Sequence, residues 1–183
     1  MQRARELVRP LFPLGLPGAF IPAAHLTARY VERRGGAGGP AIVASAWIGW
    51  LGQRGFKLFY HRERPRRRGV RRRTDSYPSG HTAGVTAVAL TCAAVLGRSG
   101  VMTRRSAWSL AAGAPLVMGV YRVIADEHWT TDVVGGWLFG VAIALGCEAL
   151  LGDAGAAREM SRAGRFSSRR RSEPRVAARA ATG

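Results

Sequence analysis

The sequence predicts an all-α fold: a membrane-embedded helical bundle of four or five transmembrane helices, followed by a disordered basic C-terminal tail. Two observations support this prediction. Long apolar stretches that are almost free of charge alternate with arginine-rich loops, as in membrane proteins with basic loops. The 183 residues also leave room for one domain. We expect this domain over residues 1–152 and the tail over residues 153–183, where large apolar residues are too few to form a core.

The strong positive charge, read alone, would suggest a nucleic-acid-binding protein. The formal net charge is +17 at pH 7, and basic chains bind phosphate polymers by releasing counterions. The arginines are nevertheless gathered mainly in residues 62–73 and 158–179, outside the apolar stretches. A mean hydropathy of −0.03 averages these two kinds of segment. We therefore expect membrane lipids, and no nucleic acid, as partners.

Four apolar segments approach the roughly 20 residues that a helix needs to cross a bilayer. They cover residues 41–60, 82–97, 106–125 and 133–152. The second is short, although its flanks can extend it. A fifth segment, residues 11–30, contains three prolines together with His25 and Arg29. Two structures remain open for it: a spanning helix, or a kinked or interfacial one.

The order of these segments predicts which loops lie together. If the four segments span in alternation, loop 62–77 and connection 126–132 lie on one membrane face, and loop 98–105 and the tail lie on the other. Gly136 and Gly140 form a small-xxx-small pair that favours close helix packing, although glycine is also common in membrane helices without this role.

Two clusters of polar residues are predicted to lie on the same membrane face as loop 62–77. Lys57 precedes Arg64 by seven residues, or two helical turns, so both can share one face; the alternative for Lys57 is a basic side chain that reaches the membrane interface. Ser79 and Gly80 directly precede the second segment, where backbone N–H groups at a helix start suit a phosphate. Helix capping would also explain both residues, but it does not explain His81.

A third group lies between the last two segments and contains Arg122, His128 and Asp132. If this stretch is helical, the four-residue spacing places the carboxylate of Asp132 beside the imidazole of His128. Asp132 can then hold Nδ1–H and leave Nε2 free as a nucleophile, as in a Ser-His-Asp triad. Each residue alone could be a satisfied polar group near the interface. Ionisable residues at membrane segments nevertheless indicate function.

Taken together, the three groups resemble the three-part motif of the type 2 phosphatidic acid phosphatase superfamily. The matching residues are Lys57-x6-Arg64-Pro65, then Pro78-Ser79-Gly80-His81, then Arg122-x5-His128-x3-Asp132. The resemblance implies that the groups converge on one phosphate within a helical bundle. It implies that His128 attacks phosphorus to form a phosphohistidine, that Asp132 orients His128, and that His81 protonates the leaving oxygen and then activates water.

The same resemblance implies which groups hold the phosphoryl oxygens. They are Lys57, Arg64, Arg122, Ser79 and the Gly80 amide. Fixed cations suit phosphoryl transfer because its transition state spreads charge over the equatorial oxygens. No set of carboxylates, cysteines and histidines with metal-ligand spacing occurs in the sequence, so we expect no metal and no other cofactor.

Two features depart from the family pattern. Tyr121 stands where the family usually has a serine before the arginine of the third motif, which puts a supporting hydrogen bond in doubt but not the nucleophile. Membrane members also usually have six spanning helices, whereas four or five are predicted here.

The expected function is hydrolysis of a lipid phosphate or polyprenyl diphosphate, since a substrate anchored in the bilayer reaches an interfacial site most easily. One alternative is a haloperoxidase-like enzyme that binds vanadate in the same site, and another is a non-catalytic basic membrane protein that binds anionic lipid. Arginine-rich loops favour a cytoplasmic site. Resemblance to bacterial relatives that act on cell-envelope lipids favours the bacterial cell membrane, with the site facing outward.

Overall fold

Helices make up most of the part of the chain that this computed structural model describes, which comprises Glu6, residues 9–65 and residues 75–152. In chain order the elements are η1 (Arg9–Gly15), α2 (Pro17–Arg33), α3 (Gly39–Phe59), α4 (Gly80–Arg98), α5 (Arg104–Ile124), α6 (Thr130–Cys147) and η2 (Glu148–Gly152). No strand occurs among these residues, so the predicted all-α fold is confirmed. The predicted tail, residues 153–183, lies outside the described residues.

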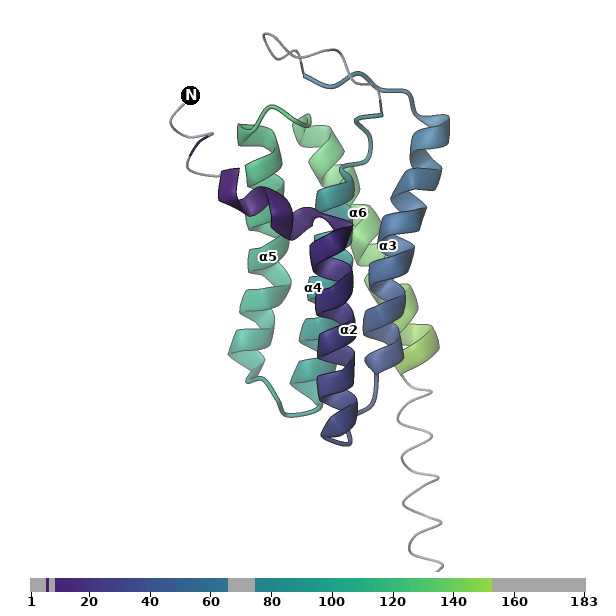
Figure 1. The fold of residues 1–183 in the computed structure, drawn as a ribbon, viewed down its shortest axis with the longest axis vertical. Coiled ribbons are helices and arrows are strands. Elements are labelled where there is room, and N and C mark those ends of the chain that lie inside the picture. Colours follow the sequence, from purple (N-terminus) through teal and green to yellow (C-terminus); the bar gives the residue numbers. More distant parts are fainter. Residues whose placement is uncertain (1–5, 7–8, 66–74, 153–183) are drawn as a thin grey trace, which may run out of the picture.

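Helix α4 is the centre of the bundle. It packs against α2, α3, α5 and α6 (Figure 1). Its buried residues are mostly small, including Ala83, Ala87 and Ala93, so neighbouring helices can approach closely. Ile42 of α3 and Val31 of α2 pack with Val95 of α4 in an apolar cluster. The bundle is therefore built around one helix that begins at the predicted Ser-Gly-His motif.

The contact between α4 and α6 depends on two glycines. A Cβ atom on Gly136 would lie 2.8 Å from the carbonyl oxygen of Ser79, and one on Gly140 would lie 2.6 Å from Cβ of Thr86. Neither position leaves room for a side chain, so the predicted small-xxx-small pair does bring two helices together. As a result, α6 lies directly beside the first two turns of α4.

Three of the described helical stretches are long and apolar enough to cross a membrane. They are Gly80–Arg98, Arg104–Ile124 and Thr130–Gly152, which correspond to the second, third and fourth predicted segments. The first predicted segment corresponds to α3, which has 21 residues but carries Gln53, Arg54 and Lys57 in its second half. Spanning by α3 stays a prediction.

The segment at residues 11–30 adopts the kinked structure. Leu16 is extended, with φ −78° and ψ 146°, and separates η1 from α2. Pro17 is the first residue of α2, a position that proline favours because its fixed φ suits a helix and no N–H is needed there. Figure 1 shows α2 running along the bundle, whereas η1 crosses one end of it.

Candidate active site

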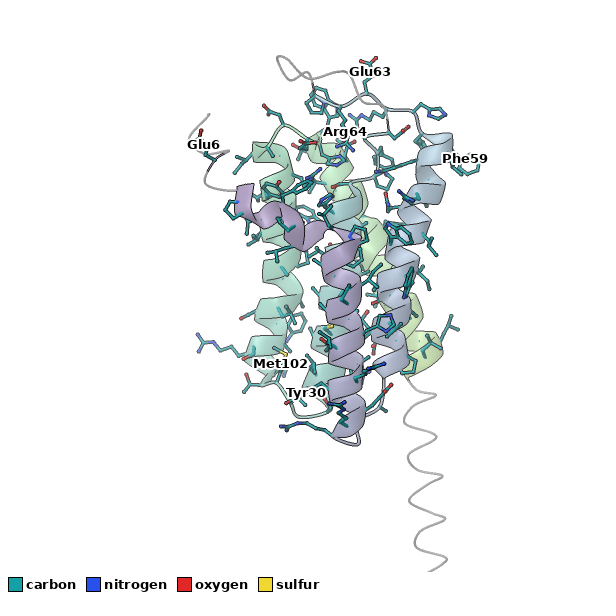
Figure 2. The ribbon with its side chains drawn as sticks, in the orientation of Figure 1. Glu6, Tyr30, Phe59, Glu63, Arg64 and Met102 are labelled. Atoms are coloured by element: carbon teal, nitrogen blue, oxygen red, sulfur yellow. The ribbon has the colours of Figure 1, made fainter. Side chains whose placement is uncertain are left out.

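A cavity of about 810 Å³ lies at the end of the bundle that η1 crosses. Its lining residues are Phe12, Gly15, Leu16, Pro17, Phe20, Trp50, Gln53, Arg54, Lys57, Arg64, Asp75, Gly80, His81, Arg122, Glu127 and His128. Figure 2 shows Arg64 at this end and Tyr30 and Met102 at the other. Six predicted site residues line the cavity, and the other two, Ser79 and Asp132, lie behind it. The expectation that the two polar loops share one end of the bundle is confirmed by this arrangement.

His128 reaches the cavity from a turn between α5 and α6. Asp126 has a φ of 53°, in the left-handed region that aspartate tolerates better than most residues. This turns the chain back after α5, so that the N–H groups of Glu127 and His128 both donate to the carbonyl oxygen of Arg122, at 3.2 and 3.3 Å. His128 is thus placed by a turn. The pairing expected from its spacing to Asp132 had instead assumed a helical stretch.

The contacts of the His128 ring define its proton positions. Nη1 of Arg64 lies 3.2 Å from Nε2, and because a guanidinium can only donate, Nε2 accepts and carries no proton. The proton of the neutral ring is therefore on Nδ1, which lies 3.5 Å from Oδ2 of Asp132. That separation is longer than a normal hydrogen bond. The predicted pairing of His128 with Asp132 is present as a close contact that a small movement would tighten.

Burial keeps His128 neutral. The side chain is almost fully enclosed, and this loss of solvation lowers the pKa of His128 to about 4, although Asp132 acts in the opposite direction. The positive charges of Arg64 and Arg122 lower this pKa as well. Because the pKa lies below its usual value of about 6.5, the ring stays uncharged at pH values well below neutrality. A neutral ring has the lone pair on Nε2 that a nucleophile requires.

Asp132 is held by three donors. It is the third residue of α6 and accepts a hydrogen bond from the backbone N–H of Trp129 at 2.9 Å, as acidic residues often do at helix starts. Nη1 of Arg62 lies 2.8 Å from Oδ1, and the hydroxyl of Ser76 donates to Oδ2. Asp132 is fully buried. Arg62 and Ser76 were not predicted as site residues, and they lie 70 and 56 residues from Asp132 in sequence.

Two arginines converge on one anionic oxygen in the cavity. Oε2 of Glu127 lies 3.5 Å from Nη1 of Arg64 and 3.8 Å from Nη2 of Arg122. Arg122 is 2% exposed, and its Nε and Nη1 have no hydrogen-bond partner among the described residues. Buried donors of this kind normally have acceptors. The arrangement therefore suits an anion with several oxygens, placed where the Glu127 carboxylate now lies.

His81 lies in the first turn of α4, across the same cavity. Its Nε2 is buried and has no hydrogen-bond partner in the described part of the chain. Lys57 lines the cavity from the last turns of α3. This position agrees with the prediction that Lys57 belongs to the site. Gly80 also lines the cavity, in contact with Gln53.

Ser79 faces away from the cavity. It is fully buried, and its hydroxyl oxygen accepts a hydrogen bond from the Thr82 hydroxyl at 2.9 Å. Its backbone N–H donates to the carbonyl oxygen of Asp132 at 3.0 Å. Ser79 therefore joins the starts of α4 and α6, and a phosphate contact from its side chain stays a prediction.

The described residues contain no group of three or more His, Cys, Asp or Glu side chains placed to hold a metal ion. The polar lining of the cavity instead consists largely of cationic and imidazole side chains, and its acidic members are Asp75 and Glu127.

Comparison with known proteins gives a consistent result. The family model of the PAP2 superfamily matches residues 39–155, which include all the predicted site residues. Non-specific acid phosphatases of Salmonella typhimurium (strain LT2) and Salmonella typhi are each 35% identical to this chain over 104 residues, or 56% of this chain. The chain spans 38% of the length of these curated relatives.

A solved structure supports the fold independently. The crystal structure described as the first transmembrane PAP2 type phosphatidylglycerolphosphate phosphatase, from Bacillus subtilis, matches with a TM-score of 0.69 and 21% identity. The match covers 79% of this chain and 75% of the other. This likeness shows that the helical bundle is the fold of a transmembrane protein of that type.

Proposed function

The chain belongs to the PAP2 superfamily, and from this premise we propose that it is a membrane phosphatase that hydrolyses a lipid phosphate or polyprenyl diphosphate through a phosphohistidine, without a metal ion. The convergence of Arg64 and Arg122 on one oxygen, with Nε2 of His128 3.2 Å from Arg64, is the observation that carries this proposal. A phosphate that replaces the Glu127 carboxylate between the two guanidiniums lies within reach of that nitrogen.

The proposed reaction uses these positions in two steps. Nε2 of His128 donates its lone pair to phosphorus, and the bond from phosphorus to the leaving oxygen breaks. His81, which enters this step as the imidazolium ion, gives the proton on Nε2 to that oxygen and becomes neutral. In the second step His81 accepts a proton from water, the resulting hydroxide attacks phosphorus, and the bond between Nε2 and phosphorus breaks. Lys57, Arg64 and Arg122 balance the charge on the phosphoryl oxygens, which is the main requirement of phosphoryl transfer.

Two features support a substrate anchored in the bilayer. Helices α4, α5 and α6 are apolar enough to span a membrane, so the cavity at one end of the bundle lies near a membrane surface. One side of the cavity is also apolar, with Leu16, Phe20 and Trp50 among its residues. A bacterial cell membrane belongs to the same proposal, supported by the bacterial origin of the similar proteins. An outward-facing site is also part of the proposal.

The test uses the whole protein purified in detergent micelles. We expect inorganic phosphate to be released from phosphatidic acid or from a polyprenyl diphosphate, at the same rate with and without an excess of EDTA. A mock purification from cells that lack the gene controls for host phosphatases. Absence of release from both lipids would contradict the proposed function. Loss of release with EDTA, restored by added magnesium, would contradict the metal-free mechanism alone.

The Ser76 hydroxyl provides a second prediction. Ser76→Ala removes one of the three donors that hold Asp132, so we expect kcat to fall by about ten-fold, the order expected for losing one hydrogen bond to a charged group. KM should change little, because Ser76 does not line the cavity. Initial rates over a range of substrate concentrations separate the two constants.

The matched control is Ser99→Ala. The Ser99 hydroxyl donates to the backbone of α4 at the opposite end of the bundle, so this variant should keep both constants. Ser76→Thr retains a hydroxyl and should recover part of the lost rate. If Ser76→Ala changes KM and leaves kcat intact, Ser76 does not act through Asp132.

A further inference from the structure

The N-terminal elements form a wall of the active-site cavity although they lie outside the region that the family model matches. That match begins at residue 39, whereas Phe12, Gly15, Leu16, Pro17 and Phe20 come from η1 and the start of α2 and line the cavity. The residues proposed to carry the chemistry all lie within the match. This wall is therefore added to the site by a different part of the chain.

Phe12 contacts two residues that are proposed to take part in the reaction. Its ring centroid lies 5.3 Å from that of His81, with the rings tilted by 37°. The guanidinium carbon of Arg122 lies 5.8 Å from the Phe12 ring centroid, within cation–π distance. Phe12 therefore lies beside the proposed proton donor and beside an arginine proposed to bind phosphate.

The position of η1 is fixed by close packing at its end. A Cβ atom on Gly15 would lie 2.4 Å from Cδ2 of His81, so only glycine allows this approach. Figure 1 shows η1 crossing the bundle near one end, and η1 contacts both α4 and α5 there. Phe12 is 40% exposed, and part of its ring is therefore available to a bound molecule.

The cavity has a cationic side and an apolar side. Arg54, Lys57, Arg64 and Arg122 form the first, and Phe12, Leu16, Pro17, Phe20 and Trp50 form the second. The phosphate must lie on the cationic side, within reach of His128. The leaving oxygen must face His81, which protonates it, so the group attached to that oxygen extends towards η1.

We propose that η1 selects the leaving group, with Phe12 as a specificity-determining residue that contacts the apolar chain next to the leaving oxygen. The proposal rests on the phosphatase function proposed above. Among the substrates proposed above, contact with an aromatic wall favours a monophosphate in which an alkyl or prenyl chain follows the leaving oxygen directly, because burial of apolar surface contributes to its binding. It favours a diphosphate less, because a second phosphate follows the leaving oxygen there. A short or polar leaving group gains little from the same wall.

The experiment compares hexyl phosphate with ethyl phosphate, two monoesters with similar leaving oxygens and different apolar length. The quantity measured is the ratio of their kcat/KM values for the full-length protein in detergent micelles, which does not depend on the fraction of active protein. We expect Phe12→Ala to lower this ratio by about ten-fold, the order set by lost apolar contacts in a pocket. Phe12→Leu should keep most of it.

Phe59→Ala is the matched control. Phe59 is 82% exposed at the end of α3 and points away from the bundle in Figure 2, so the ratio should stay at the wild-type value. An unchanged ratio in Phe12→Ala, or an equal fall in Phe59→Ala, would overturn the role of η1 and leave the phosphatase function standing. Wild-type protein that hydrolyses neither ester nor the two lipids would overturn both.

Discussion

Replacing His128 with alanine is expected to lower phosphate release by about a thousand-fold or more, the order seen when a catalytic nucleophile is removed. The substitution deletes the ring nitrogen that lies 3.2 Å from Nη1 of Arg64, and alanine offers no lone pair to phosphorus. The protein should still fold, because His128 lies in a turn outside the helices and belongs to neither apolar cluster. Phosphate release, helix content by circular dichroism and elution from a sizing column in detergent are the measurements.

His61→Ala is the control for this change. His61 lies at the same end of the bundle, its side chain is 70% exposed, and it contacts Asp75 instead of lining the cavity. This variant should keep its turnover. Turnover in His128→Ala at the wild-type rate would rule out His128 as the nucleophile, and with it the phosphohistidine.

The helices could be predicted from the sequence because their lengths follow from local composition. Residues 82–97, 106–125 and 133–152 coincide with α4, α5 and the stretch from α6 to η2, apart from a few residues at their ends. For residues 11–30, with their three prolines, a spanning helix and a kinked or interfacial one were both left open, and the structure has a break at Leu16. The direction of η1 after that break depends on its packing against His81, which no local pattern contains.

The site residues that could be predicted are those that belong to short motifs with a fixed spacing. His81 of α4, Arg122 of α5 and His128 of the turn before α6 line one cavity. The support of Asp132 was not predicted, because Arg62 and Ser76 are 70 and 56 residues away from it in sequence. Arg62 also begins a block of arginines that are chemically alike, so sequence alone could not show which of them binds the carboxylate.

His81→Ala is expected to slow formation of the phosphoenzyme by about a hundred-fold or more with an alkyl monophosphate, within the range for general acid catalysis. An alkoxide is a poor leaving group and needs a proton in the transition state. A nitrophenolate leaves readily without one, so the first step with an aryl phosphate should be slowed much less. Nε2 of His81 lies in the cavity wall, has no hydrogen-bond partner among the described residues, and is the group that would supply this proton.

The second step of the reaction provides a further test of His81. Hydrolysis of the phosphohistidine needs His81 as a base whatever the first substrate was. With the aryl phosphate, His81→Ala should therefore release a burst of nitrophenolate close to one equivalent per site and accumulate acid-labile phosphate on His128. Single-turnover rates on both substrates, with quantification of the trapped phosphate, measure this. His25→Ala is the control, since His25 contacts Trp47 and does not line the cavity. Equal slowing on both substrates without a trapped intermediate would mean that His81 binds phosphate or shapes the cavity and transfers no proton.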